Sequence, residues 1–291
     1  MHPAPSLILF TVLSGTGFGL LVWLGLGLAA PVGVAAFMLF GLGYALSGAG
    51  LIAAAFHLGH PERALKAFTQ WRSSWLSREA VLASATMAIM APHAASSVFA
   101  GTPLPLFGWL GAVLALVTIF ATAMIYTQIK AVPRWRHWST PPVFVLAALA
   151  GGALLAAQST LALLLMLALG VAMVTHWVIG DRQFTEAGSD TGTATGLGGL
   201  GKVRLLEPPH SGRNYLLREM VHVVGRKHAY KLRIIALATG VLIPVALLLI
   251  LPLGYATIAL ALILHLAGMA AQRWLFFAEA EHVVGLYYGK R

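Results

Sequence analysis

An imidazole and a carboxylate stand at the two ends of one polar stretch between two long apolar runs. The stretch extends from His57 to Glu79 and reads HLGHPERALKAFTQWRSSWLSRE. Histidine changes its charge near neutral pH, and a positioned carboxylate can donate or accept a proton. A polar ring that must be bound and protonated, such as a quinone head, needs these groups and an apolar slot. We therefore predict a quinone site in which His57 and Glu79 act as ligand and as proton donor or acceptor.

Basic residues lie between these two groups, and we assign Arg63 and Arg78 to the edge of the predicted pocket or to a docking surface. Each titratable residue also has a simpler interpretation. An acid is favoured at the N-terminus of a helix, which would explain Glu79 by itself. His57 could be an interfacial side chain that only faces water.

A second polar cluster, YTQIKAVPRWRHWSTPP, begins at Tyr126. We include Tyr126 among the candidate quinone-binding residues and assign Trp135 and Trp138 to the aromatic belt at the membrane–water boundary. Arg273 lies inside the last apolar run. A charge at that depth is costly and usually faces the protein interior, so Arg273 is a further candidate. The alternative is that its long side chain reaches back to the interface.

Three further histidines lie within apolar runs, namely His93, His176 and His265. A b-type haem needs two histidines at matched depth, and helical rise places these three at different depths. His57 with His176 is the best-matched pair and would compete with the quinone interpretation. We expect no haem, and a chain without cysteine supplies no thiolate for an iron–sulfur cluster or a zinc ion.

The composition indicates which scaffold must position these residues. Of 291 residues, 59% are hydrophobic and 10% are charged, whereas a soluble domain carries about 25% charged residues. A membrane-spanning helix needs about 20 mostly apolar residues. The sequence predicts an all-α polytopic membrane protein, a single domain over 1–291. Its eight expected transmembrane helices lie at 7–30, 33–57, 79–100, 104–129, 142–157, 159–180, 231–252 and 255–278.

The basic residues fall on one side of these spans. An even number of spans places both termini on that side, and all 19 Lys and Arg residues lie there or at its membrane edge. By the positive-inside rule this side is cytoplasmic, so we expect both termini in the cytoplasm. The net charge of +10 then reports orientation in the lipid membrane, and we expect no nucleic-acid partner.

The long cytoplasmic loop 181–230 is the one sizeable polar region. Its first part, TEAGSDTGTATGLGGLG, is predicted to be flexible. Residues 196–201 fit GxGxxG, but no βαβ unit surrounds them, so we exclude a nucleotide site. The basic part has apolar residues at helical spacing, which predicts an interfacial helix or a surface for docking a partner. These residues are Leu216, Leu217, Met220, Val221 and Val224.

Four segments carry a resemblance to a known family: MHPAPSLILFTVLSGTGFG at the start, FHLGHPERAL at 56–65, SREA at 77–80 and YTQIKAVPRWRHWSTP at 126–141. On these segments the sequence resembles the membrane anchor subunit of dimethyl sulfoxide reductase-type molybdoenzymes, over all eight expected spans. The resemblance implies a haem-free anchor in a bacterial inner membrane. Such an anchor exchanges electrons between ubiquinone or menaquinone and an iron–sulfur subunit, which serves a molybdopterin catalytic subunit. The family's quinol-site histidine and glutamate match His57 and Glu79.

Two departures from the better-known reductase anchors concern the substrate. The insertion at 181–230, and the lack of an acid near Met269 in AGMAAQR, make the sequence more similar to the branch that anchors cytoplasmic sulfite dehydrogenases. That branch implies sulfite oxidation with quinone reduction, with both partner subunits docked on the cytoplasmic face. The alternative within the family is a dimethyl sulfoxide reductase anchor that oxidises menaquinol. Alternatives from other classes are a transporter, with His265 as its main central titratable group, and a purely structural anchor.

Overall fold

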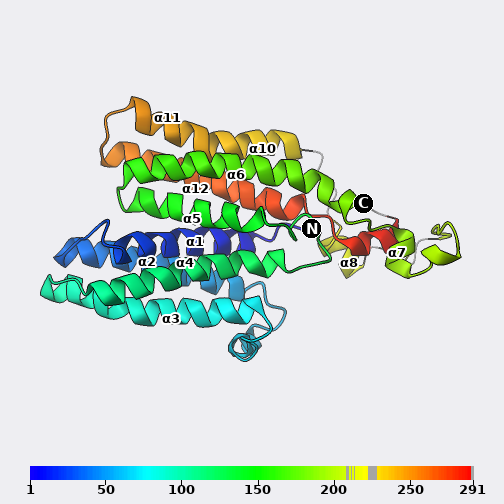
Figure 1. Cartoon of the computed structure of the whole chain (residues 1–291), viewed down its shortest axis with the longest axis horizontal. Helices are drawn as coiled ribbons and strands as arrows, with labels where there is room; N and C mark the ends of the chain where they lie inside the picture. Colours follow the sequence, from blue (N-terminus) through cyan, green and yellow to red (C-terminus); the bar gives the residue numbers. More distant parts are fainter. Residues whose placement is uncertain (208–209, 211, 213, 222–227, 290–291) are drawn as a thin grey trace.

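A computed structural model describes residues 1–207, 210, 212, 214–221 and 228–289. The regular structure within these residues is helical throughout (Figure 1), which confirms the all-α class. Seven helical segments in the described part of the chain are long and apolar enough to cross a membrane. They are α1 (Pro5–Gly25), α2 (Gly33–Ala55), α3 (Trp75–Ala95) with its π-helical extension η2 (Ser96–Ala100), α4 (Pro105–Thr127), α6 (Ser159–Glu186), α10 (Ala229–Leu237) continued by η4 (Ala238–Leu242) and α11 (Ile243–Ile250), and α12 (Tyr255–Ala278).

The expected fifth span corresponds to α5 (Thr140–Leu155), which has 16 residues. At 1.5 Å per residue it is about 24 Å long, somewhat less than the ~30 Å hydrocarbon core of a bilayer. Figure 1 shows it running beside α1 through the middle of the bundle. Its depth inside the protein explains how a short helix is accommodated, since few of its backbone groups meet lipid.

Helix α1 is the central element of the bundle, because it packs against α2, α4, α5 and α12. Its approach to α5 is close at Gly19, where an added Cβ atom would lie 1.9 Å from the Ala148 carbonyl oxygen. The Trp23 indole also donates a hydrogen bond to the Leu149 carbonyl oxygen at 2.9 Å. Glycine at this position therefore lets the backbones of α1 and α5 meet, as small residues do between membrane helices.

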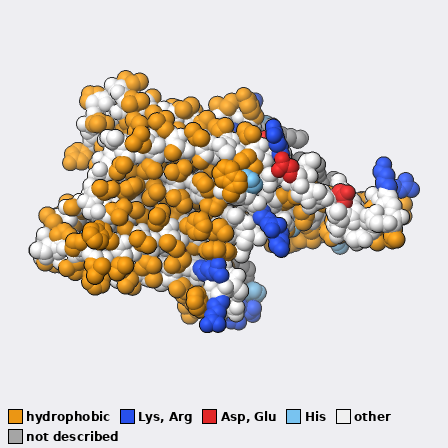
Figure 2. Space-filling view, in the orientation of Figure 1, with side chains coloured by type: hydrophobic (Ala, Val, Ile, Leu, Met, Phe, Trp, Pro, Cys, Tyr) orange, Lys and Arg blue, Asp and Glu red, His pale blue; other side chains and the backbone are white. Residues whose placement is uncertain are grey.

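The outer surface of the bundle is apolar. Large exposed side chains lie on several helices, among them Val34, Phe37, Phe99, Trp109 and Val171. The face drawn in Figure 2 is covered by hydrophobic side chains, while Lys and Arg gather at one end of the bundle. Both termini lie at that same end (Figure 1). The apolar flank and the single charged end agree with a multi-pass membrane protein.

Short helices form much of the polar end. They are η1 (Pro61–Phe68), α7 (Thr191–Thr195), η3 (Gly198–Leu200), α8 (Tyr215–Glu219) and η5 (Val283–Tyr288). The tract expected to be flexible thus contains α7, which Asp190 caps through a reciprocal pair of hydrogen bonds with Thr193. The Tyr287 hydroxyl donates to the Ala194 carbonyl oxygen and joins α7 to η5. The capping box and the contact with η5 explain why this part of the tract is helical, although the sequence predicted a flexible segment.

The interfacial helix expected around residues 214–224 corresponds in part to α8. The Asn214 side chain caps it by accepting a hydrogen bond from the Leu217 amide at 2.9 Å. Val224, and the rest of 222–227, lie outside the described residues. The end of α6 at Glu186 also means that the polar connection begins later than 181.

Candidate functional site

Glu79 lies inside the bundle. Helix α3 begins at Trp75, because the Ser74 hydroxyl accepts a hydrogen bond from the Ser77 amide at 3.4 Å. Glu79 is therefore on the second turn and does not begin the helix as the sequence predicted. Its side chain is turned inward, and the residue is 3% exposed. The Thr122 hydroxyl of α4 donates a hydrogen bond to its carboxylate.

Thr122 fits both protonation states of this carboxyl group. Its hydroxyl has one hydrogen and faces two acceptors, Glu79 Oε1 and the Thr118 carbonyl oxygen at 3.1 Å. When Glu79 is ionised, the hydrogen points to the carboxylate. When Glu79 is protonated, its carboxyl group can donate to the Thr122 oxygen, whose own hydrogen then points to Thr118. Glu79 thus keeps its hydrogen bond to Thr122 in both protonation states.

His57 lies in a different environment from Glu79. It follows the C-terminus of α2 and is exposed, and its backbone amide donates to the Ala54 carbonyl oxygen at 3.1 Å. Phe56 beside it is 78% exposed. Within the described residues no hydrogen bond joins His57 to Glu79. The structure thus places the imidazole on the exposed loop and the carboxylate inside the bundle.

The two arginines predicted at the pocket edge, Arg63 and Arg78, also lie outside the interior. Arg63 is exposed on η1, with its Nε atom 3.9 Å from Glu62 Oε1. Arg78 donates to two loop carbonyl oxygens, those of Trp71 at 3.0 Å and Arg72 at 2.7 Å. Its guanidinium also lies 4.4 Å from the centre of the Trp75 ring. Arg78 therefore holds together the segment that leads into α3.

Arg273 faces the interior, as one of the two sequence interpretations expected. It is 2% exposed, and its guanidinium lies 3.6 Å from the centre of the Phe144 ring. Its Nη1 atom donates to Gln272 Oε1 at 2.9 Å. Tyr126 is 6% exposed, and the centre of its ring lies 5.6 Å from that of Phe144, the ring on which Arg273 rests. The structure thus groups Glu79, Tyr126 and Arg273 inside the bundle and leaves the other three predicted residues outside.

Trp138 is 65% exposed, which is compatible with the aromatic belt predicted for it, whereas Trp135 is 2% exposed, so its assignment to the belt is wrong. The Trp135 indole donates to the Phe276 carbonyl oxygen at 2.9 Å. Its ring stacks on the Phe276 ring at 5.1 Å and contacts Tyr126 edge-on at 5.3 Å. A buried partner for the indole N–H explains why this tryptophan is part of the core.

The three histidines within the helices are engaged by hydrogen bonds. His93 Nδ1 lies 2.9 Å from the Leu104 carbonyl oxygen, and His176 Nδ1 lies 3.0 Å from the Ser139 hydroxyl. His265 Nδ1 lies 2.7 Å from the carbonyl oxygen of Gly240, within the π-helical turn η4. Each of these Nδ1 atoms links the histidine to another segment of the fold. The expectation that no haem binds stays a prediction.

Four charged residues that the sequence analysis did not single out form a network at the polar end. Arg134 and Arg233 each contact both acids of the network, Asp181 on α6 and Glu279 at the end of α12. The Arg233 Nε atom lies 2.7 Å from Glu279 Oε1, and its Nη2 atom lies 2.6 Å from Asp181 Oδ1. The signal that could have found them is the position of both acids next to long apolar runs, where an unpaired charge is costly.

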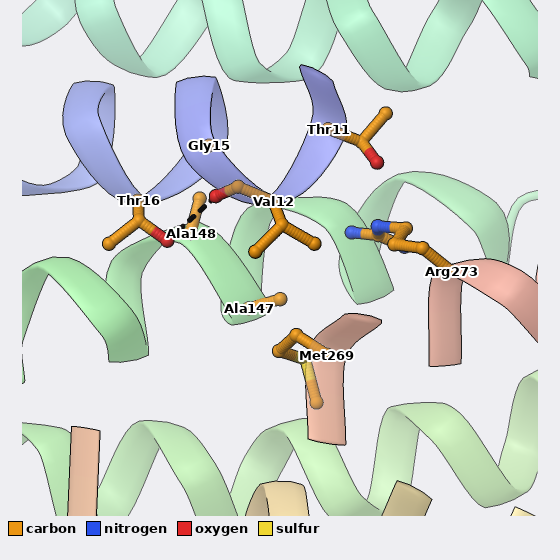
Figure 3. A pocket seen from close by; sticks show the side chains of 8 residues that line it. All are labelled: Thr11, Val12, Gly15, Thr16, Ala147, Ala148, Met269 and Arg273. Carbon is orange, nitrogen blue, oxygen red and sulfur yellow. Dashed lines mark hydrogen bonds between the residues drawn. The ribbon is translucent and has the colours of Figure 1, made fainter. Parts of the chain in front are cut away.

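Two cavities lie near the buried group of residues, and each has a volume of about 10 Å³. One is lined by residues of α1, α5 and α12, including Arg273 (Figure 3). The other is lined by residues of α1, α4 and α5, including Thr122. A single water molecule needs about 10–15 Å³ measured in this way, so each cavity has room for one water and none for a quinone ring.

Comparison with known proteins places these features in a family context. A family model described as DMSO reductase anchor subunit (DmsC) matches residues 1–178. A sulfite dehydrogenase subunit of Allochromatium vinosum is 31% identical over 327 aligned residues, which cover 99% of each chain. No solved structure matches the chain. The matched region contains His57, Glu79 and Tyr126, whereas Arg273 lies beyond the part covered by the family model.

Proposed function

The chain belongs to the family of DMSO reductase anchor subunits, and on that premise we propose that it is the quinone-reactive membrane subunit of a molybdenum oxidoreductase. In this proposal electrons pass between the membrane quinone pool and an iron–sulfur subunit, and from there to or from a molybdopterin catalytic subunit. The observation that carries the proposal is the Glu79 carboxylate, buried with a hydroxyl partner suited to both of its protonation states.

Reduction of a quinone to a quinol consumes two electrons and two protons, so the protein must supply proton donors beside the ring. His57 is exposed on the loop and can exchange a proton with water, while the buried Glu79 would supply a second proton from the interior side of α3. The two small cavities in the interior, lined by Arg273 and by Thr122, have no room for a quinone ring. We therefore place the quinone head on the loop side, where His57 and the exposed Phe56 supply a polar group and an apolar surface.

The orientation follows from the charge distribution. We propose that α5 is an eighth span, that both termini face the cytoplasm and that the membrane is a bacterial inner membrane. The clustering of Lys and Arg at the end that carries both termini supports this orientation (Figures 1 and 2). The two partner subunits would dock at this end, next to His57.

For the reaction of the complex we propose sulfite oxidation coupled to quinone reduction. The observation in favour is the near full-length similarity to the sulfite dehydrogenase subunit of Allochromatium vinosum. Sulfite and water give sulfate, two protons and two electrons, which is the number of electrons that one quinone takes up. Dimethyl sulfoxide reduction by menaquinol would reverse the electron flow, and His57 and Glu79 would then accept the two protons that the quinol releases.

The proposal is tested in the complete complex with His57→Ala and Glu79→Gln. We expect both variants to lower quinone-dependent turnover by about 100-fold or more, the range for loss of a proton-transfer group. Reduction of an artificial dye by the catalytic subunit should stay unchanged. His60→Ala is the matched control, because His60 is exposed in the same loop and pairs with Glu62 at 2.9 Å.

Three results would count against the proposal. Unchanged quinone-dependent turnover in both variants would show that the site lies elsewhere. Loss of dye reduction or of complex assembly together with quinone turnover would make His57 and Glu79 structural residues of an anchor. An equal loss in His60→Ala would mean that the loop is sensitive to any substitution.

A further inference from the structure

Arg273 of α12 carries a charge in the interior that the Glu79 carboxylate of α3 could balance. The Arg273 guanidinium rests on the Phe144 ring and donates to Gln272, and no carboxylate among the described residues forms an ion pair with it. A buried cation without an anion nearby is costly inside a membrane protein. A buried charge of this kind indicates a functional role.

We propose that Arg273 is a positioning residue for Glu79 and acts on it through two internal water molecules, one in each of the small cavities. This inference rests on the proposed function, because it assigns a role in the proton exchange of Glu79. Its physical content is a polar chain that runs from Glu79 through Thr122, a first water, Thr11 and a second water to Arg273.

The two cavities meet on the same face of α1. Thr11 and Gly15 line both of them. The cavity toward α4 is also lined by Thr122, which donates to Glu79. The cavity toward α12 is also lined by Arg273. Figure 3 shows Arg273 reaching from α12 toward Val12 and Thr11 of α1, so its guanidinium and the Thr11 side chain border one space.

Both cavities offer what a buried water needs. A water is retained where the space fits one molecule and two to four polar groups surround it. The volume of about 10 Å³ meets the first condition in each case. Thr11, Ser14 and Thr122 line one cavity. The Thr11 and Ser14 hydroxyls donate to the backbone carbonyl oxygens of Leu7 and Phe10, so they can accept a hydrogen bond from a water but not donate one. Thr11, Thr16 and Arg273 line the other. The Thr16 hydroxyl donates to the Val12 carbonyl oxygen and can likewise only accept from a water, to which the Arg273 guanidinium can donate.

The chemistry that this chain would perform concerns the charge left on Glu79. When Glu79 gives its proton to a reduced quinone, a carboxylate remains inside the bundle. A guanidinium linked to it by oriented hydroxyls and waters stabilises that anion, and the same link weakens when the carboxyl group regains its proton. Tyr126 packs against Phe144, which lines the cavity toward α4. Arg273 therefore need not touch the quinone.

Gly15→Ala tests the water chain directly. An added Cβ atom at Gly15 would lie 3.6 Å from Ala148 Cβ, an ordinary contact, so the helix can accept the methyl group at the border of both cavities. Gly48→Ala on α2 is the matched control, because nothing lies within 4 Å of its added Cβ atom. In the complete complex we expect Gly15→Ala to lower quinone-dependent turnover about tenfold relative to the control.

A second measurement does not depend on turnover. The infrared carbonyl band of Glu79, identified by its loss in Glu79→Gln, reports the hydrogen bonding of the carboxyl group. We expect Gly15→Ala and Arg273→Met to shift this band and Gly48→Ala to leave it in place, whereas Arg273→Lys should restore the wild-type position in part. A band unaffected by both Gly15→Ala and Arg273→Met would overturn the inference.

The failure of this inference can be told from the failure of the proposed function. If Glu79→Gln abolishes quinone turnover while Gly15→Ala behaves as Gly48→Ala does, Glu79 is functional and the water chain is refuted. If Glu79→Gln leaves quinone turnover intact, the proposed site itself is wrong, and the inference falls with it.

Discussion

Thr122 of α4 donates its hydroxyl hydrogen to the Glu79 carboxylate of α3. This contact joins two residues 43 positions apart in the chain, and it lies in a bundle whose surrounding helices are apolar. A hydroxyl with a second acceptor one turn away can follow the protonation state of the acid. The contact is therefore the part of the predicted site that most directly concerns proton exchange.

Thr122→Val, which keeps the shape of the side chain and removes the hydroxyl, tests this relationship. The carboxyl group of Glu79 would lose its donor, at a cost of about 1–3 kcal/mol in unfolding free energy for a buried polar group. We expect quinone-dependent turnover to fall by about tenfold or more. Thr122→Ser restores the hydroxyl and should recover most of the turnover. Equal activity of the valine and wild-type proteins would show that the hydroxyl has no part in it.

Arg78→Lys examines the order of the loop that leads to Glu79. A lysine cannot bond the Trp71 and Arg72 carbonyl oxygens at once while stacking on Trp75, as the guanidinium does. Backbone amides at 69–75 should then exchange with deuterium faster, and quinone-dependent turnover should fall a few-fold. Arg63→Lys, at an exposed position, is the control. Similar exchange in both variants would contradict a role of Arg78 in ordering the loop.

The architecture could be predicted from the sequence because it depends on long apolar runs. Seven of the eight expected spans have helices of membrane-crossing length within the described residues, and the eighth corresponds to α5. The helix ends were less predictable. Ser74 caps α3, which begins at Trp75, four residues before Glu79. Helix α6 continues to Glu186, although Asp181 and Arg182 look like the start of a loop. Asp181 is held by arginines of other segments, which a local pattern does not reveal.

The site could be predicted in part. Residue types drew attention to His57, Glu79 and Arg273, but sequence periodicity does not fix how a mostly apolar helix is rotated. The inward direction of Arg273 depends on the packing of α12 against α1 and α5. Thr122 was missed because a threonine in an apolar run is unremarkable until its partner on another helix is known. Long-range packing thus decides which residues face one another.

Glu279→Gln should be more destabilising than Asp181→Asn in the charged network at the polar end. Side-chain exposure is 4% for Glu279 and 47% for Asp181. Without the Glu279 carboxylate, the partly buried Arg134 and Arg233 share a single counter-charge, that of Asp181. Breaking a buried ion pair in this way lowers the free energy of unfolding by about 3–5 kcal/mol. Asp181→Asn should be less destabilising, because water can solvate the arginines where the exposed Asp181 carboxylate is removed. Thermal unfolding of the purified complex measures both, and equal shifts would contradict this ranking.

His282 should make the C-terminal segment sensitive to acid. Burial, and then the positive N-terminus, hold the pKa of its imidazole below the ordinary value of 6.5. The neutral ring caps η5 by accepting a hydrogen bond from the Val284 amide at 3.0 Å. Because the unfolded segment binds the proton more tightly, this stabilisation is present above about pH 6.5 and is lost as the pH falls below that value. Deuterium exchange at 283–288, corrected for intrinsic rates, should therefore accelerate at about pH 5.5 relative to about pH 7.5.

His282→Asn is the control, because its side chain keeps a hydrogen-bond acceptor that does not titrate. Corrected exchange at 283–288 in this variant should not depend on pH. The same pH dependence in both proteins would assign the effect to another group.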